Sequence, residues 1–195
     1  MHTRTGARAL PCTRALAAAL TALALAATAQ AGEFQLHSAD IRPLGEIANK
    51  FVYKGFGCSG ENVSPELSWS GAPAGTRSFA LLVHDPDAPT GGAGWWHWVA
   101  YDIPASVQEI AQGAGTADGA RMPKGTVQAR TDFGSAGWGG PCPPPGHGKH
   151  HYRFTLYALK VDMLEVPEGA SAALIGFSAH ANALGEASLT GLYGR

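Results

Sequence analysis

The sequence has few charged residues and almost no net charge. Only 15% of its 195 residues are Asp, Glu, Lys or Arg, and the formal net charge at pH 7 is -1. The 14 basic residues are scattered along the chain and form no cluster. Nucleic-acid binding and charge-driven binding to a membrane surface both depend on such a cluster. We therefore expect no nucleic acid and no membrane surface among the partners.

The sequence also lacks an apolar run long enough to span a bilayer. An alanine- and leucine-rich run covers residues 15–27, whereas a spanning helix needs about 20 apolar residues. Three arginines precede this run, and Ala-Gln-Ala at 29–31 fits a small-x-small cleavage site. We predict that residues 1–31 are a cleaved secretory signal peptide, with no stable membrane insertion. With no linker or repeat to divide them, residues 32–195 are expected to form a single domain, periplasmic or secreted.

Cysteine is scarce, with three residues in the chain. Cys12 precedes the apolar run, a placement that does not suit lipid attachment, and it would leave with the signal peptide. The remaining pair, Cys58 and Cys142, would enter an oxidising compartment, and we predict that they form a disulfide. The alternative is two buried thiols that never meet, because geometry decides whether a bond forms.

Several sequence signatures of enzymes are missing. The chain has no Gly-x-Ser-x-Gly nucleophile motif, no phosphate-cradling P-loop and no Rossmann fingerprint. No other evident nucleophile stands out. We therefore expect a protein that is not an enzyme and that uses no cofactor.

Glycine and proline, in contrast, are abundant, with 26 and 13 residues. Many lie between apolar segments, which is typical of an all-β fold with elaborate connections. Apolar and alternating segments predict strands at residues 34–41, 78–84, 96–103, 126–131 and 152–158. Near the end of the chain, four apolar residues recur at helical spacing and a glycine follows: Leu174, Phe177, Ala181, Leu184 and Gly185. They predict one helix, followed by a final strand to Tyr193.

Two carboxylates and a histidine flank one predicted turn. The apolar run 81–83 leads to Asp85 and Asp87, each followed closely by proline, which cannot continue a central strand. An aromatic strand at 95–101 then carries His97 back into the fold. This arrangement brings acid and imidazole together. The alternative is purely structural: Asp before Pro commonly initiates a turn, and a histidine between tryptophans is often a packed core residue.

A second polar cluster occupies residues 139–152, which read Gly-Gly-Pro-Cys-Pro-Pro-Pro-Gly-His-Gly-Lys-His-His-Tyr. This loop delivers His150 and Tyr152 to the same face of a following strand. His147, His150 and His151 with Cys142 could suggest zinc. We expect no metal, because Cys142 is assigned to the disulfide and successive strand residues face apart. His147 is expected to belong to a solvated loop tip.

Taken together, these motifs resemble the phosphatidylethanolamine-binding protein family. The resemblance rests on Asp-Pro-Asp-Ala-Pro at 85–89, Gly-Trp-Trp-His-Trp at 94–98 and the Gly-Pro-x-Pro-Pro loop at 140–152. Asn-Val-Ser-Pro-Glu-Leu-Ser-Trp at 62–69 and Arg-Thr-Asp-Phe-Gly at 130–134 add to it. The motifs occur in the family's order, and the short C-terminus is similar to the bacterial Raf-kinase-inhibitor-like branch.

The resemblance implies a mainly β fold: a Greek-key β-sandwich of two antiparallel sheets, with the C-terminal helix covering an edge or a face and a final strand after it. It also implies an anion site for phosphate-like head groups. The matching positions are Asp85, His97 and His150, with Asp87, Gly140 and Tyr152 nearby.

Each of these side chains has an expected role. An imidazole donates a hydrogen bond to a phosphate oxygen and, once protonated, adds charge assistance. Asp85 would orient a histidine or, as the alternative, pair with the amine of ethanolamine, and Asp87 would brace its loop. On this view the affinity for anions falls as the pH rises past about 6.5, where free imidazole loses its charge.

The expected function is therefore that of an exported ligand-binding or regulatory protein whose pocket takes a small anionic or phosphorylated group. The alternative is a protease or kinase inhibitor that acts through a protein-binding surface outside the pocket. An unidentified protein partner and a homodimer both stay open.

The disulfide can be tested directly. Mass spectrometry of the non-reduced, exported protein should find Cys58 and Cys142 in one cross-linked peptide pair. Two free thiols at these positions would contradict the predicted disulfide.

Overall fold

The computed structural model describes residues 1–3 and 32–195. The predicted signal peptide lies outside the described residues, except for its first three. Within the described ranges, no helix is both long and apolar enough to cross a bilayer. The elements are β1 (Gln35–His37), η1 (Asn49–Phe51), β2 (Lys54–Gly55), β3 (Cys58–Ser59), β4 (Leu67–Ser70), β5 (Ser78–Asp85), β6 (Trp95–Pro104), β7 (Glu109–Ile110), β8 (Val127–Gln128), β9 (His150–Leu159), α1 (Ala172–Asn182) and β10 (Ala183–Tyr193).

The strands form antiparallel sheets. The main sheet has five strands in the order β10-β9-β5-β6-β8, a second has three in the order β1-β4-β7, and β2 pairs with β3 alone. In the main sheet β9 returns to pair with β5 and not with β8, which precedes it. The order β9-β5-β6-β8 is that of a Greek key. The predicted Greek-key sandwich is confirmed.

The larger hydrophobic core lies between the main sheet and the three-stranded sheet. Leu67 and Trp69 of β4 meet the inward residues of the main sheet, among them Leu81 and Val83 of β5 and Phe154 of β9. Along β9, buried residues alternate with partly exposed ones, as expected for a strand with unlike faces. This core fixes the strand ends on which the polar side chains stand.

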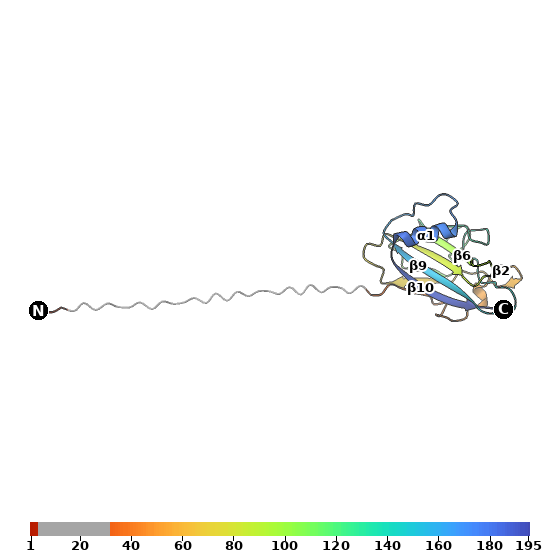
Figure 1. Cartoon of the computed structure of the whole chain (residues 1–195), viewed down its shortest axis with the longest axis horizontal. Helices are drawn as coiled ribbons and strands as arrows, with labels where there is room; N and C mark the ends of the chain where they lie inside the picture. The colour runs from red at the N-terminus through yellow and green to blue at the C-terminus, as the bar shows by residue number, and fades with distance from the viewer. Residues whose placement is uncertain (4–31) are drawn as a thin grey trace. The chain divides into compact units, whose positions relative to one another are not determined.

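Helix α1 covers the opposite face of the main sheet, where it lies across β9, β5 and β6 (Figure 1). A second apolar cluster joins Ile175 and Ala179 of α1 to Leu82 and Val99 of the sheet. Strand β5 is therefore buried on both faces. This explains why its sequence is a continuous apolar run and not an alternating one.

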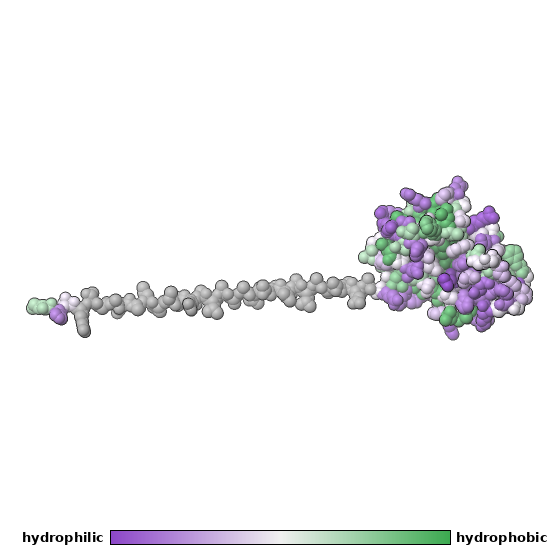
Figure 2. All heavy atoms as spheres, in the orientation of Figure 1, coloured by the Kyte–Doolittle hydropathy of each residue, from purple (hydrophilic) through white to green (hydrophobic). Residues whose placement is uncertain are grey.

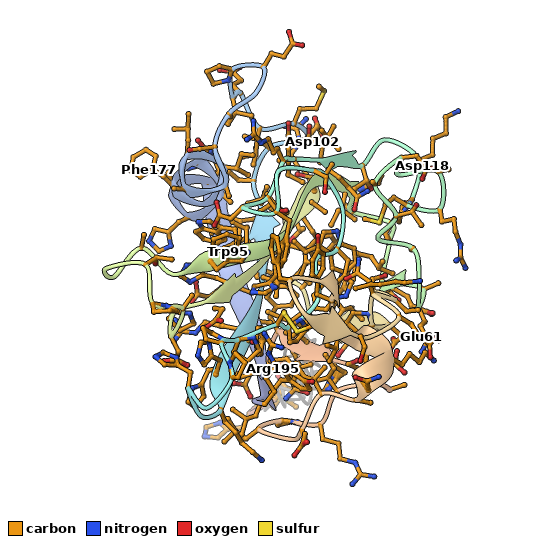
Figure 3. The ribbon with its side chains drawn as sticks, turned by 90° about the vertical axis from the view of Figure 1, so that its right-hand side faces the viewer. Glu61, Trp95, Asp102, Asp118, Phe177 and Arg195 are labelled. Carbon is orange, nitrogen blue, oxygen red and sulfur yellow. A yellow bond between two sulfur atoms is a disulfide. The ribbon has the colours of Figure 1, made fainter. Side chains whose placement is uncertain are left out.

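The helix was predicted from apolar residues at helical spacing, but two of these residues do not pack against the sheet. Leu174 and Phe177 are 40% and 72% exposed. The buried residues of α1 are Ala172, Ile175 and Ala179. Phe177 points away from the sheet (Figure 3), and apolar residues gather on the surface over α1 (Figure 2). The helix carries apolar residues on two faces, so spacing alone could not tell which face packs.

Other element bounds also differ from the prediction. The predicted strand at 126–131 is reduced to β8, because the chain turns back on itself and Thr131 N donates to Ser135 O. The first strand ends at His37, and Ile41 is buried in the loop beyond it. Gly185 does not stop the helix, since α1 ends at Asn182 and Gly185 lies within β10.

The predicted disulfide joins Cys58 of β3 to Cys142 of the proline-rich loop, 84 residues apart in sequence. In the chain-entropy model a bridge that closes so long a loop stabilises the fold by about 4 to 5 kcal/mol. It also ties the β2–β3 hairpin to the loop that leads into β9.

The assignment of the helix face can be tested with a matched pair of variants. Ile175→Ala removes a buried side chain from α1 and should lower the free energy of unfolding by about 2 to 4 kcal/mol. Phe177→Ala, two residues away, removes a larger but exposed side chain and should change it by about 0.5 kcal/mol or less. Urea denaturation of both variants measures the difference. Equal losses would show that the face is misassigned.

Candidate functional site

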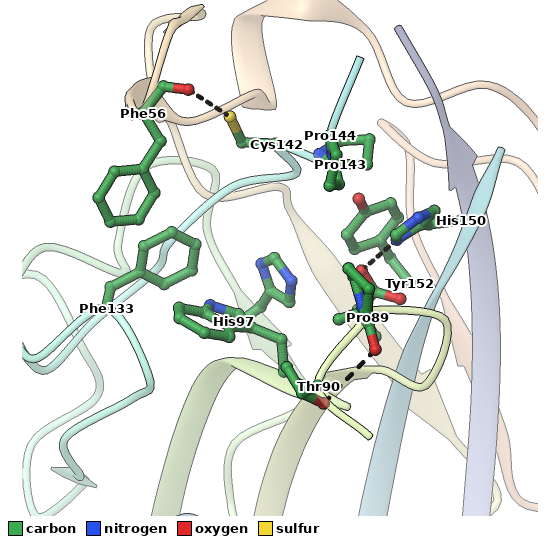
Figure 4. A pocket seen from close by; sticks show the side chains of 13 residues that line it. Phe56, Pro89, Thr90, His97, Phe133, Cys142, Pro143, Pro144, His150 and Tyr152 are labelled. Carbon is green, nitrogen blue, oxygen red and sulfur yellow. Dashed lines mark hydrogen bonds and ion pairs between the residues drawn. The ribbon is translucent and has the colours of Figure 1, made fainter. Parts of the chain in front are cut away.

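The described part of the chain contains a pocket of about 210 Å³ where β5 ends and where β6 and β9 begin (Figure 4). Its wall combines strand residues with the loops that follow β5 and precede β9. The lining residues are Phe56, Asp85, Ala88, Pro89, Thr90, Trp95, His97, Phe133, Cys142, Pro143, Pro144, His150 and Tyr152.

The structure brings four of the six predicted ligand-binding residues together in this pocket. Asp85 comes from the end of β5, His97 from β6, and His150 and Tyr152 from the start of β9. All four are almost fully buried. Asp87 and Gly140 do not line the pocket; Asp87 precedes Ala88, which does, and Gly140 follows Gly139, whose carbonyl oxygen bonds to the ring of His97.

Asp87 braces the turn after β5. Its carboxylate accepts hydrogen bonds from the backbone N and the ring Nδ1 of His151, at 2.8 and 2.7 Å. Its own backbone N donates to Asp85 Oδ1. Partial burial acts to raise the pKa of Asp87, but the bonds from His151 outweigh this effect and the pKa lies below its usual value.

Gly140 is held behind the pocket by the backbone of a neighbouring segment. Its N donates to Asn62 Oδ1 at 2.8 Å. A Cβ atom at this position would lie 2.0 Å from the carbonyl oxygen of Phe51. The position therefore requires glycine for close packing.

A β-bulge turns His97 toward the pocket. In the pairing of β5 with β6, Val83 lies opposite Trp98 and His84 lies opposite Trp96, which leaves His97 without a partner. A bulge of this kind inserts one residue and shifts the alternation of side chains beyond it. His97 consequently lies against Tyr152, Phe133 and Trp138, on the side that faces the larger core. Regular alternation would have sent it to the opposite face from Trp98.

Two hydrogen bonds tie His97 to Gly139 of the proline-rich segment. The ring Nδ1 lies 2.6 Å from Gly139 O, and Gly139 N donates to the backbone O of His97 at 2.9 Å. A carbonyl oxygen only accepts, so Nδ1 carries the proton. In the neutral ring, Nε2 is then an acceptor.

Burial lowers the pKa of His97 to about 4, because desolvation disfavours the charged ring. His97 is therefore neutral at physiological pH. This differs from the expectation that its imidazole donates to an anion, since the donating nitrogen is already used by Gly139.

Asp85, His150 and His147 form a chain of polar contacts. His150 Nδ1 donates to Asp85 Oδ2 at 2.7 Å, and both side chains are buried. His150 Nε2 lies 2.8 Å from Nδ1 of His147. The expectation that Asp85 orients a histidine fits this geometry. His147, assigned from sequence to a solvated loop tip, instead contacts a buried residue of the site.

Three buried polar atoms of the pocket lining have no hydrogen-bond partner within the described residues: Trp95 Nε1, His97 Nε2 and the Tyr152 hydroxyl. Burial, followed by the nearby charge of Asp85, raises the pKa of Tyr152, so its hydroxyl stays protonated and able to donate. Unpartnered buried polar atoms are uncommon in native proteins. All three belong to residues that line the same pocket (Figure 4).

Aromatic and proline side chains complete the wall, and sequence reasoning missed most of them. Phe56 lies on the β2–β3 hairpin, and its ring stacks 5.9 Å from that of Phe133. Phe133 also lies edge-on to Trp95. Pro143 and Pro144 close another side. The density of prolines at 141–145 was a signal for a shaped loop, but nothing in the local sequence connected Phe56 to it.

The charges around the pocket are few. Asp85 brings a carboxylate, His150 carries a positive charge only when protonated, and no Lys or Arg is among the described residues that line the pocket. No group of three or more His, Cys, Asp or Glu within the described ranges is placed to hold a metal ion. Cys142 is in the disulfide, and His151 is turned to Asp87.

The buried neutral state of His97 makes stability depend on pH. Because its pKa falls from 6.5 when unfolded to about 4 when folded, its contribution is complete above pH 6.5 and is lost as the pH falls toward 4. The loss should reach about 3 kcal/mol. His97→Asn, which keeps a donor for Gly139 O but does not titrate, should remove this part of the acid destabilisation. Urea denaturation between pH 4 and 8 measures it, with exposed His37→Asn as the control, and an unchanged pH profile in His97→Asn would contradict the assignment.

Comparisons with known proteins agree with this fold. Residues 37–194 match the family profile described as phosphatidylethanolamine-binding protein. YbcL, a UPF0098 protein of Escherichia coli strain K12, is 48% identical over 166 residues, which are 85% of this chain and 90% of YbcL. YbhB of the same organism is 45% identical over 159 residues, covering 82% of this chain and 99% of YbhB.

A Mycobacterium tuberculosis protein named as a lipoprotein, LppC, is 45% identical over 139 residues, covering 71% of this chain and 63% of LppC. The crystal structure of E. coli YbcL, described as a new member of the mammalian PEBP family, superposes with a TM-score of 0.81 and covers 84% of this chain and 99% of YbcL. The chain therefore belongs to the phosphatidylethanolamine-binding protein family, in the bacterial UPF0098 branch that contains YbcL and YbhB.

Proposed function

We propose that this is an exported protein that binds a small anionic or phosphorylated group in the pocket and carries out no chemistry on it. The observation that carries the proposal is the set of three unpartnered buried atoms on the described pocket lining: His97 Nε2, the Tyr152 hydroxyl and Trp95 Nε1. A buried polar group without a partner costs about 1 to 3 kcal/mol. A ligand that bonds to these atoms would recover that free energy.

The size of the pocket favours a head group over a larger molecule. Its volume of about 210 Å³ is below the roughly 300–1,000 Å³ of pockets that enclose drug-sized ligands. The inner end carries the polar atoms, and the wall toward Phe56 and Phe133 is apolar. A phosphate at the inner end with a short substituent along the wall fits this division.

The contacts among Asp85, His150 and His147 resemble an acid–base relay, but the described pocket lining offers no evident nucleophile for the relay to activate. Cys142 is oxidised in the disulfide. The Thr90 hydroxyl lies 3.0 Å from Gly94 O, to which it donates. We therefore assign Asp85 and His150 to positioning, which agrees with the absence of nucleophile motifs from the sequence.

Export is part of the proposal. It is supported by the pattern of residues 1–31, which reads as a signal peptide, and by the Cys58–Cys142 disulfide, since such bonds persist in oxidising compartments. The name of the similar protein LppC, a lipoprotein, points the same way.

The alternative function, inhibition of a protease or kinase through a surface outside the pocket, has one observation in its favour. Leu174 and Phe177 are exposed on the outer face of α1, and apolar side chains are frequent in the centres of protein interfaces.

Calorimetric titration separates the two functions. The oxidised protein, expressed from the full chain, should bind inorganic phosphate and phosphorylethanolamine saturably at pH 6. Tyr152→Phe removes only the hydroxyl, and its affinity should fall about tenfold, which corresponds to about 1.4 kcal/mol for one hydrogen bond. Thermal unfolding of each variant confirms that it is folded.

Two neighbours on β9 serve as controls. Tyr157→Phe makes the same chemical change on the opposite face of the sheet, and His151→Asn changes a histidine that pairs with Asp87 outside the pocket. Both should bind phosphate as the unaltered protein does. If neither ligand binds, the pocket is not the working site, and the exposed face of α1 becomes the surface to test.

A further inference from the structure

The inner end of the pocket offers an acceptor where an anion site would be expected to offer only donors. His97 Nδ1 donates its proton to Gly139 O. The other ring nitrogen, Nε2, therefore carries a lone pair and can only accept, and it has no partner among the described residues. The Tyr152 hydroxyl and Trp95 Nε1 are also unpartnered; the hydroxyl can donate or accept, and the indole N–H only donates. A ligand that satisfies all three atoms must offer an acceptor to the indole and must itself carry at least one O–H or N–H for Nε2.

The charges around the pocket point in the same direction. The described residues that line the pocket include the buried carboxylate of Asp85 but no Lys or Arg. A doubly charged anion would face that carboxylate without a permanent cation to offset it. A ligand with one negative charge and a hydrogen to donate meets both constraints.

We propose that the pocket selects a phosphate group in its monoprotonated, singly charged form, with the P–O–H donating to His97 Nε2 and a second phosphate oxygen accepting from the Tyr152 hydroxyl. This inference rests on the proposed function and narrows it from anions in general to phosphomonoesters and inorganic phosphate. An ammonium group would satisfy Nε2 but has no acceptor for the tyrosine proton.

Two classes of anion should therefore bind more weakly. Sulfate has nearly the shape of phosphate but carries no proton near neutral pH. A phosphodiester has one negative charge but no P–O–H to donate. The head-group phosphate of an intact phospholipid is a diester, so the pocket discriminates against it in favour of a free phosphomonoester.

The proton that controls binding then belongs to the ligand. A phosphomonoester loses its second proton with a pKa of about 6, so its affinity should fall about tenfold per pH unit above that value. Titratable groups of the protein also act on the site: His84 and Asp85 from β5, Asp87 from the turn after it, His150 and Tyr152 from β9, and Tyr193 from β10. His147 contacts His150 from the loop.

A comparison of two ligands shows whether the pH dependence comes from the proton of the ligand or from a titratable group of the protein. Phosphorylethanolamine and methylphosphonate should each be titrated calorimetrically into the oxidised protein between pH 5.5 and 8. Methylphosphonate holds its last proton to a higher pH, so its affinity should begin to fall at a correspondingly higher pH. One midpoint shared by both ligands would show that a protein group controls binding and would overturn the inference.

Anions without a proton give the second test. At pH 6 sulfate and dimethyl phosphate, a small diester, should bind at least about tenfold more weakly than inorganic phosphate, as expected when a buried acceptor is left unpaired. Sulfate that binds as tightly as phosphate would overturn this inference and leave the proposed function standing. If no anion binds at all, both fail together.

A pair of variants assigns the selectivity to His97. His97→Asn keeps a donor for Gly139 O but removes Nε2, so the preference for phosphate over sulfate should disappear. Tyr152→Phe should weaken both anions and leave their ratio unchanged. The ligand comparisons are made on the unaltered protein, so the inference can be overturned even if His97→Asn fails to fold.

Discussion

The contact between His97 and Gly139 is the constraint on which the site depends. Through paired hydrogen bonds it holds strand β6 against the segment that leads into the proline-rich loop, so that two parts of the chain 42 residues apart form one wall. The same contact fixes the ring tautomer. A single bond to a carbonyl thus decides both where the histidine stands and whether its free nitrogen gives or takes a proton.

Close to this contact, the carboxylate of Asp85 is already hydrogen-bonded within the protein. Asp85 is occupied on both oxygens, by Asp87 N and by His150 Nδ1, and so serves as a fixed negative charge more than as a free ligand-binding group. Breaking such a buried pair by removing one partner usually costs several kcal/mol. The arrangement is rigid, and a rigid set of donors and acceptors can distinguish ligands by where their protons lie, which a mobile cationic site cannot do.

Sequence reasoning reached the fold and much of the site because the signals were local. The continuous apolar run of β5 and the alternation of β9 predicted buried strands, and the motifs around Asp85, His97 and His150 predicted one pocket. What the sequence did not predict, or predicted wrongly, depended on three-dimensional packing. The bulge at His97 is set by pairing with β5, the buried face of α1 by which of two apolar sides meets the sheet, and the role of His147 by a loop that folds back on His150. None of these is encoded in spacing along the chain.

The turn between β5 and β6 connects two site residues whose positions are fixed by the strands. On either side of it, strand register holds Asp85 and His97 in place, whereas at its tip a Cβ at Gly91 or Gly92 would meet nothing within 4 Å. Between them, Pro89 and Thr90 form part of the pocket wall. Open space does not make these two positions exchangeable: Gly91 and Gly92 have φ values of +76° and +101°, which residues with a Cβ atom rarely adopt, so the turn beside the pocket wall depends on glycine even where it is exposed.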